Sequence, residues 1–269
     1  MKTIWKYAIL ITGAVAFAYP FLWMIAGSLR PELEISRLGL FSEHFSLHSY
    51  EQVVTKIPIG RAFINSLIVS ISTTVTVVVF GSMVGYALAK LKFFGNTVIY
   101  MIILFTMMIP FQIVLIPQYI LMVKLGWTDT YLSLIAPSMM SAFSIILFRQ
   151  FFMGVPQALI DAARIDGCTE FGILVHMIWP LSKPVMITVG LLTFMTNWNE
   201  VLWPLMVVRE RSLMTLPQMV TLFTIGGEAE SQLGALLAAA TLLSLPIIIA
   251  YAFFQRHFIE SMASAGLKG

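Results

Sequence analysis

Charged side chains are scarce in this sequence. Asp, Glu, Lys and Arg together make up 11% of its 269 residues, whereas 59% are hydrophobic and the mean hydropathy is +0.90. An average soluble domain has about 25% charged and about 45–50% apolar residues. The composition therefore excludes an ordinary water-soluble protein and predicts an integral membrane protein.

Several sequence signals of chemistry are also absent. The single cysteine, Cys168, excludes an intrachain disulfide. The sequence contains no Gly-x-x-x-x-Gly-Lys-Ser/Thr phosphate loop, no Gly-x-Ser-x-Gly elbow and no His-Glu-x-x-His pair. Of the four histidines only His44 and His48 are close in sequence, and we expect both to be solvated. We therefore predict that the chain is not an enzyme and has no catalytic residue, metal site or cofactor of its own.

Long apolar runs recur along the chain without internal repeats or linkers, so we predict one domain, residues 1–269. A helical span needs about 20 mostly apolar residues. The first run follows Lys2 and Lys6, as in a signal peptide, but it continues through Ile25, which favours a span. The prediction is an all-α fold of six transmembrane helices at Tyr7–Leu29, Ile64–Ala89, Val98–Met122, Tyr131–Phe152, Val185–Val208 and Leu233–Phe254.

The basic residues indicate an orientation in the membrane. Six spans place both termini on one side, which then holds nine of the 16 Lys and Arg residues, against seven on the other side. The seven lie in longer segments that also carry acids, and the positive-inside rule weights short loops most heavily. We therefore predict a multi-pass protein of the cytoplasmic (inner) membrane with both termini cytoplasmic.

Residues 154–184, which we call the elbow segment, form a charged and punctuated stretch between apolar runs. Pro156 suits the first turn of a helix, and Gly167 supplies the positive φ that ends one. A second short helix is predicted over Thr169–Ile178, and the chain is expected to turn again at Pro180 and Pro184. Two short helices that meet at a glycine form either a compact projection outside the membrane or an amphipathic helix lying on it.

The elbow segment resembles the cytoplasmic coupling loop, with its Glu-Ala-Ala signature, of the membrane subunits of ATP-binding-cassette importers. Asp161-Ala162-Ala163 matches the acidic-Ala-Ala element, Asp166-Gly167 the Asp-Gly element and Ile178-Trp179-Pro180 the exit. Asp161 stands where the family usually has Glu, and Cys168 where a small Ala is common. The resemblance implies a short cytoplasmic coupling helix between spans four and five that contacts an ATPase through Asp161, Ala162, Ala163, Asp166, Gly167, Cys168, Thr169 and Phe171.

Span five carries a polar cluster whose members are Thr193, Thr196, Asn197 and Glu200. Their three- and four-residue spacing places them on one helical face. With a rise of about 1.5 Å per residue from Val185, Asn197 lies roughly 18 Å across the membrane. Ionisable groups at this depth usually face a bundle interior or a water-filled path. The cluster is therefore either a solute path formed by Thr193, Asn197 and Glu200 or a structural hydrogen-bond cluster.

Two tryptophans adjoin this cluster. Trp198 and Trp203 have amphipathic rings of the kind that either stack on sugars or anchor a span at the membrane interface. The sequence leaves both interpretations open.

Nearly the whole chain resembles the smaller permease subunit of carbohydrate importers of the maltose type. The matching stretches are Asn65–Ser70, Tyr86–Ala89, Ile109-Pro110, Asn197–Pro204, Thr215–Pro217, Gln255-Arg256 and Gly266–Gly269. The resemblance implies a permease that moves a sugar or similar polar solute by alternating access. Its implied partners are a second permease subunit, two ATPase subunits that bind ATP and magnesium, an extracytoplasmic solute-binding protein and membrane lipid, with no nucleic acid. The segment 209–232 would face the binding protein.

A secondary transporter or channel that works alone is the competing class. Such a protein needs ion- or proton-coupling groups in several spans, whereas Glu200 is the only acid inside a predicted span. A membrane enzyme is a third and weaker alternative, because the catalytic motifs named above are absent.

Overall fold

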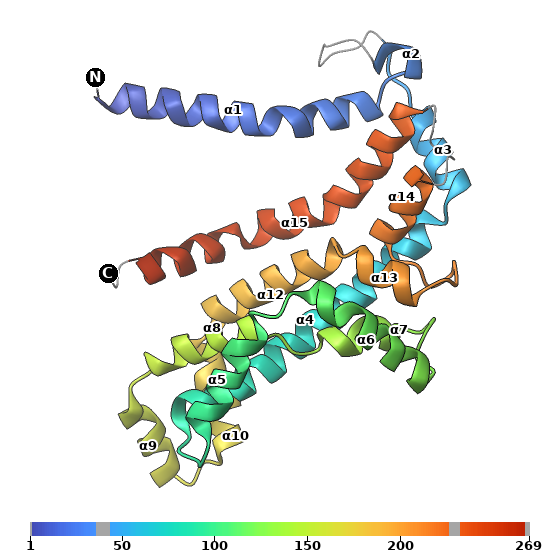
Figure 1. Ribbon diagram of the computed structural model, residues 1–269. Helices are drawn as coiled ribbons and strands as arrows, with labels where there is room; N and C mark the ends of the chain where they lie inside the picture. The colour runs from blue at the N-terminus through green and yellow to red at the C-terminus, as the bar shows by residue number, and fades with distance from the viewer. Residues whose placement is uncertain (1, 36–43, 226–231, 267–269) are drawn as a thin grey trace. The chain divides into compact units, whose positions relative to one another are not determined.

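The computed structural model describes residues 2–35, 44–225 and 232–266, and the regular elements in these ranges are all helical (Figure 1). The prediction of an all-α fold is confirmed. The chain divides into two compact units: unit 1 contains residues 1–63 and 215–248, and unit 2 contains residues 64–214 and 249–269. The long helices α4 (Ile59–Lys90) and α15 (Leu233–Gly266) each contribute to both units. That the chain is a single domain stays a prediction.

Three helices are each long and apolar enough to cross a membrane: α1 (Lys2–Ser28), α4 and α15. They lie where the first, second and sixth spans were predicted. In α15, however, the helix continues to Gly266 instead of giving way to a tail after Phe254.

The other candidate spans are bent pairs of helices, so the described chain has three spans, or up to six if each pair counts as one. The first pair is α5 (Asn96–Thr106) with α6 (Phe111–Leu125), bent by 99°. The second is α7 (Tyr131–Ile135) and η1 (Ala136–Ser138) with α8 (Ala142–Met153), bent by 42°. The third joins α10 (Glu170–Ile173), η2 (Leu174–Ile178) and α11 (Trp179–Leu181) to α12 (Lys183–Trp198), bent by 85°. The third pair covers Glu170–Trp198, so the predicted bounds of the fifth span, Val185–Val208, are wrong: α12 ends at Trp198 and does not reach Val208.

Prolines account for part of this bending. Pro110 precedes α6 with an extended backbone (φ −61°, ψ 133°), and because it has no N–H it cannot extend the preceding helix. Pro117, in contrast, lies inside α6 and does not end that helix. Pro180 likewise lies inside α11, directly after the π-helical turn η2. The chain turns two residues later, at Ser182, whose hydroxyl donates to the carbonyl of Ile178 over 2.6 Å.

Unit 1 contains three short helices besides its long ones: α2 (Glu32–Ile35), α3 (His48–Lys56) and α14 (Leu216–Ile225). The carboxylate of Glu32 accepts hydrogen bonds from the N–H groups of Leu233 and Gly234 and so caps the first turn of α15. A Cβ at Gly234 would collide with Ser49 and Glu32, which explains why a glycine stands there. The two histidines expected to be solvated, His44 and His48, are exposed.

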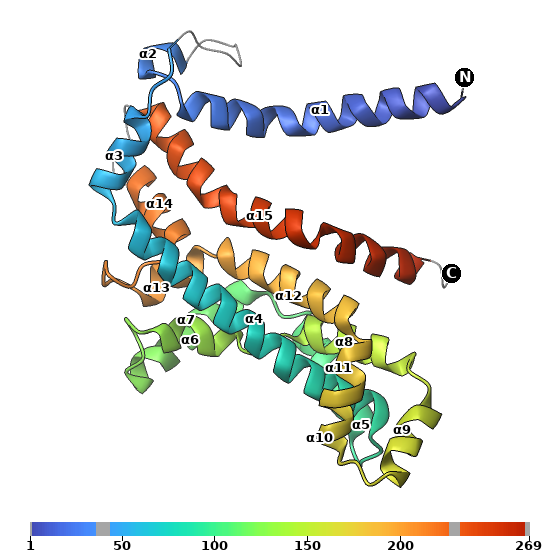
Figure 2. The ribbon, with the colours of Figure 1, turned by 180° about the vertical axis from the view of Figure 1, so that it is seen from behind.

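Unit 2 holds two apolar clusters. In one cluster, side chains of α4, α8 and α12 pack with residues of the elbow segment around Phe148 and Phe152. In the other, α6, α7 and α13 (Leu202–Val207) pack around Trp203. Figures 1 and 2 show α9 (Gln157–Ile165) and α10 at the end of unit 2 where α4 finishes, and α6, α7 and α13 at its other end.

Candidate functional site

The elbow between α9 and α10 is built by local capping. Gly167 has φ +81°, a conformation that favours glycine, and its N–H donates to the carbonyl of Arg164 over 3.0 Å. The N–H of Cys168 donates to the carbonyl of Ala163, also over 3.0 Å. These two bonds form a Schellman motif, which closes the end of α9. The hydroxyl of Thr169 then accepts from the N–H of Gly172 over 3.1 Å and caps the start of α10.

The elbow segment has one buried and one exposed apolar face. Ile160 and Ile173 are fully buried against Phe148 and Phe152. On the other face, Leu159, Ile165 and Phe171 are exposed, the last two by 87% and 60%. Many apolar side chains of the candidate spans are also exposed, but these three lie in a segment that carries charged residues.

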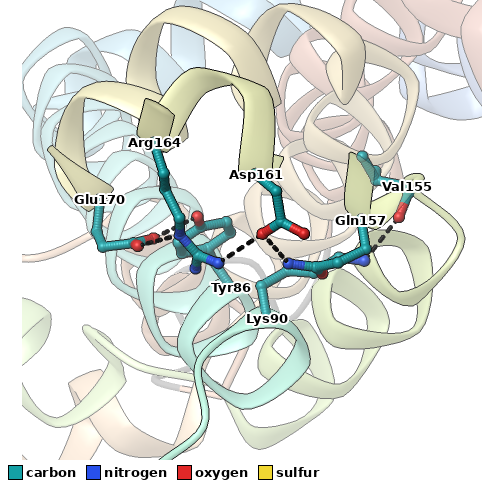
Figure 3. Close-up of polar contacts among 7 residues, drawn as sticks. All are labelled: Tyr86, Lys90, Val155, Gln157, Asp161, Arg164 and Glu170. Atoms are coloured by element: carbon teal, nitrogen blue, oxygen red, sulfur yellow. Dashed lines mark hydrogen bonds and ion pairs between the residues drawn. The ribbon is translucent and has the colours of Figure 1, made fainter. Parts of the chain in front are cut away.

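A polar network joins the two helices of the elbow to each other and to α4 (Figure 3). Arg164 donates through Nε to Glu170 over 2.7 Å and through a terminal nitrogen to Asp161 over 3.0 Å. Asp161 also accepts from the amide of Gln157 over 3.0 Å. The other oxygen of Glu170 accepts from the hydroxyl of Tyr86, in α4, over 2.7 Å. The hydrogen bond to Glu170 raises the pKa of Arg164, which therefore stays charged.

The structure brings the predicted contact residues together in this elbow. Asp161 and Ala162 lie in α9, exposed, beside the half-buried Ala163. The remaining five are exposed at the turn and in the first residues of α10: Asp166, Gly167, Cys168, Thr169 and Phe171. The helix predicted to stop at Gly167 ends at Ile165, and Asp166 is its C-cap.

The predicted solute-path residues lie at the far end of α12. The amide of Asn197 donates to the carbonyl of Thr193 over 2.9 Å, so these two residues share a face, and both are half-buried. Glu200 does not continue this face, because α12 ends at Trp198. Instead its carboxylate accepts from the N–H of Trp203, in the first turn of α13, over 3.1 Å. The prediction of one continuous helical face is therefore wrong for Glu200.

Neither tryptophan near this cluster is exposed. Trp203 is 4% exposed, donates from its ring N–H to the carbonyl of Ser133 over 2.8 Å, and packs edge-on against Phe111. Trp198 is fully buried and stacks on Phe194 with ring centroids 5.7 Å apart. Both side chains therefore pack inside the protein, which fits neither a sugar-stacking surface nor an anchor at the membrane interface.

A second polar centre lies near the other end of α4. Asn65, 1% exposed, donates to the carbonyls of Ser212 and Met214, both over 2.9 Å, and accepts from the hydroxyl of Tyr131 over 2.7 Å. It thereby fixes the segment after α13, residues 208–214, to α4.

Asp129 holds the same segment from a neighbouring turn. Its carboxylate accepts from the N–H groups of Arg209 and Glu210 over 2.6 and 2.8 Å, and its own N–H donates to the carbonyl of Val207. The two backbone hydrogen bonds to the carboxylate, from Glu210 first and then Arg209, lower the pKa of Asp129. Asp129 also has a positive φ of 55°, which Asp tolerates better than most residues.

Sequence reasoning missed several of these residues. Tyr86 entered only as part of a stretch that resembles the family, and no local pattern indicated the contacts of Lys90, Arg164 or Glu170. Their partners lie up to 84 positions away in the sequence, as in the bond between Tyr86 and Glu170. An aromatic hydroxyl one turn before the end of a span was the only available signal.

Proteins of known family resemble this chain along most of its length. Residues 58–264 match the family of binding-protein-dependent transport system inner membrane components. The chain is 37% identical over 257 residues to the arabinooligosaccharides transport system permease protein AraQ of Halalkalibacterium halodurans, covering 93% of this chain and 91% of the relative. It is 34% identical over 266 residues to AraQ of Bacillus subtilis, covering 95% and 92%.

A solved structure has a similar fold. It is the crystal structure of a bacterial ABC transporter involved in the import of the acidic polysaccharide alginate. The match has a TM-score of 0.81 at 24% sequence identity and covers 95% of this chain and 96% of that chain. The family match spans more than half of the chain, and the two relatives align with nearly all of it. The chain therefore belongs to the family of inner-membrane components of binding-protein-dependent transport systems.

Proposed function

We infer that the chain is the permease subunit of an ATP-driven importer and that the elbow segment is its coupling loop. The observation that carries this proposal is the exposed apolar face of the elbow, with Ile165 and Phe171 at its tip. Such a rigid, capped projection can bind in a groove of an ATPase subunit, so that movement of the ATPase displaces the elbow. A second permease subunit, two ATPase subunits that bind ATP and magnesium, and an extracytoplasmic binding protein complete the proposed assembly.

In this proposal the contact with the ATPase is made by the turn and the helix faces beside it. The residues are Asp161, Ala162, Ala163, Asp166, Gly167, Cys168, Thr169 and Phe171. Asp161, which is paired with Arg164, and Asp166 supply carboxylates, and the small, exposed Ala162 allows close approach of a partner. We propose six spans, with each bent pair counted as one, so that both termini lie on the same side of the membrane as the elbow; the excess of Lys and Arg on that side supports the cytoplasmic side.

The cargo of the proposed importer is a sugar or a similar hydroxyl-rich solute. Support comes from the two relatives, whose names describe transport of arabinooligosaccharides. We place the solute path along Thr193 and Asn197, which share a face of α12, and next to Glu200 at its end. Hydroxyl, amide and carboxylate groups can replace the water around a sugar as it crosses.

Purification of the tagged chain from its own membrane tests the proposed assembly. A second permease and an ATPase should co-purify with the wild-type chain. With Ile165→Glu, the amount of co-purified ATPase should fall at least tenfold, and the amount of the permease partner should not change. Leu33→Glu is the matched control, because Leu33 is also exposed but lies in α2, away from the elbow in sequence and in unit 1. Transport by the purified chain without any ATPase would contradict the proposal.

A further inference from the structure

The last turn of α4 holds the elbow segment on both sides of α9. Tyr86 and Lys90 are four residues apart, so they lie on one face of α4. The ammonium group of Lys90 donates to the carbonyl of Val155, just before α9, over 2.6 Å. The hydroxyl of Tyr86 donates to Glu170, just after the turn that follows α9 (Figure 3).

From Glu170 the connection continues into α9. The oxygen that Tyr86 leaves free accepts from Arg164, and Arg164 also binds Asp161. An unbroken series of hydrogen bonds therefore runs from α4, through α10, to the middle of the helix proposed to touch the ATPase.

The two ends of the bond between Tyr86 and Glu170 lie in different surroundings. Tyr86 is 3% exposed and its ring packs edge-on against Phe152, with centroids 6.4 Å apart, so the position of its hydroxyl is fixed by α4 and α8. The side chain of Glu170 is 41% exposed and is already paired with Arg164. Water and Arg164 can therefore satisfy this carboxylate without a phenol. The bond is therefore dispensable for Glu170 but satisfies the buried hydroxyl of Tyr86, and it sets where α10 sits relative to α4.

We propose that Tyr86 is a positioning residue for coupling: through Glu170 and Arg164 it ties the elbow to α4, so that displacement of the elbow by the ATPase moves α4. The proposal rests on the proposed function of the elbow segment as a coupling loop. The alternative is that the apolar contacts of Ile160 and Ile173 alone transmit the displacement.

The test uses the intact importer with its ATPase subunits and binding protein, in proteoliposomes. Tyr86→Phe removes the hydroxyl and keeps the buried ring. The expected result is about a fivefold fall in solute moved per ATP hydrolysed, the size that loss of one net hydrogen bond allows. Recovery of the ATPase and basal ATP hydrolysis should stay at the wild-type level, because a merely structural defect would lower both.

Tyr131→Phe is the matched control. It removes a hydroxyl that makes a 2.7 Å bond to Asn65, at the other end of unit 2, and should leave the ratio of solute to ATP within twofold of wild type. Glu170→Ala tests the same connection from the exposed side; because it leaves the buried hydroxyl of Tyr86 without its acceptor, the thermal stability of this variant is measured as well. It should lower the ratio by a similar factor, and the double variant Tyr86→Phe, Glu170→Ala should be no worse than either single variant.

The outcomes distinguish a failure of the role of Tyr86 from a failure of the proposed coupling function of the elbow segment. A wild-type ratio in Tyr86→Phe or in Glu170→Ala, or additive losses in the double variant, overturns the role of Tyr86 and leaves the coupling loop standing. A wild-type importer whose ATPase does not respond to solute overturns the coupling function itself and the role of Tyr86 with it.

Discussion

The two ends of unit 2 hold their loops to α4 by different chemistry. At the elbow, the buried hydroxyl of Tyr86 donates to the carboxylate of Glu170, whose side chain is 41% exposed and is also paired with Arg164. At the other end, which we call the Asn65 end, a neutral amide with almost no exposure makes three hydrogen bonds. The two sites are 21 residues apart along α4, about 30 Å in a helix.

This difference in exposure sets how much each interaction contributes to the stability of the fold. An ion pair exposed to water contributes about 0–1 kcal/mol, because solvation of the separated charges offsets most of the attraction. A buried polar group left without its partner costs about 1–3 kcal/mol. The exposed ion pairs within the elbow therefore contribute little to stability. The bonds to the buried Tyr86 and Asn65 side chains contribute more, because breaking either leaves a buried polar group without its partner.

The largest expected effect is at the elbow turn. Gly167→Pro removes the N–H that binds the carbonyl of Arg164 and forbids the positive φ, so the Schellman motif cannot form. Solute-stimulated ATP hydrolysis by the assembled importer should be abolished. Normal stimulation in this variant would mean that the turn has no part in coupling.

A pair of alanine variants controls for backbone strain. Gly167 and Gly126 both follow a helix with positive φ, +81° and +68°, and among the described residues a Cβ added at either would meet no atom within 4 Å. Alanine at either site should cost about 1–2 kcal/mol in folding. Only Gly167→Ala should reduce stimulation, because Gly126 ends α6 away from the elbow.

The next effect should be at Asn65. Asn65→Leu leaves two carbonyls and the hydroxyl of Tyr131 without their partner, and we expect a loss of about 2 kcal/mol in stability. Thermal unfolding of the purified chain in detergent measures it. Thr76→Val is the control on the same helix, because the Thr76 hydroxyl binds only carbonyls of its own helix. Equal losses of stability in the two variants would show that the bonds of Asn65 to other segments add nothing beyond those of a side chain bonded within its own helix.

A smaller change is expected on the proposed solute path. Asn197→Leu should reduce transport roughly tenfold, the effect of about 1.4 kcal/mol in solute binding. Asn199→Leu is a close control: Asn199 makes the same kind of bond, to the carbonyl of Met195 over 2.8 Å, but is exposed at the end of α12. Equal transport by the two variants would indicate that these amides serve only the helix.

The smallest effect concerns pH at the Asn65 end. Because the backbone N–H groups of Glu210 and Arg209 lower the pKa of Asp129, its contribution is complete above the unfolded value of about 3.9 and is lost as the pH falls through the lower folded value. Thermal stability of the wild type should therefore exceed that of Asp129→Asn above about pH 4 and converge with it in stronger acid. Asn keeps the tolerance for positive φ. Parallel curves would contradict the assignment.

Local sequence signals predicted the elbow well. Pro156, Gly167 and Thr169 act on residues within a few positions, so the ends of α9 and α10 could be expected from the chain alone. The turn expected at Pro180 and Pro184 is also present, because the chain bends by 85° at Ser182 between them. Local reasoning does not account for Pro117, which lies inside α6. Local reasoning also failed to predict that Glu200 lies beyond the helix, because no glycine or proline marks the end of α12 at Trp198.

What the sequence by itself determined is the class of protein and the elbow with its exposed residues. Apolar content is a sum over residues and capping acts over a few positions, so neither depends on distant contacts. Only the tertiary structure decided that Tyr86 binds Glu170 and that Asn65 binds residues 212 and 214. These partners are 84 and about 150 positions apart, and a hydrogen bond depends on atoms meeting within about 3 Å. Helix packing brings them together, and no short-range pattern in the sequence encodes that meeting.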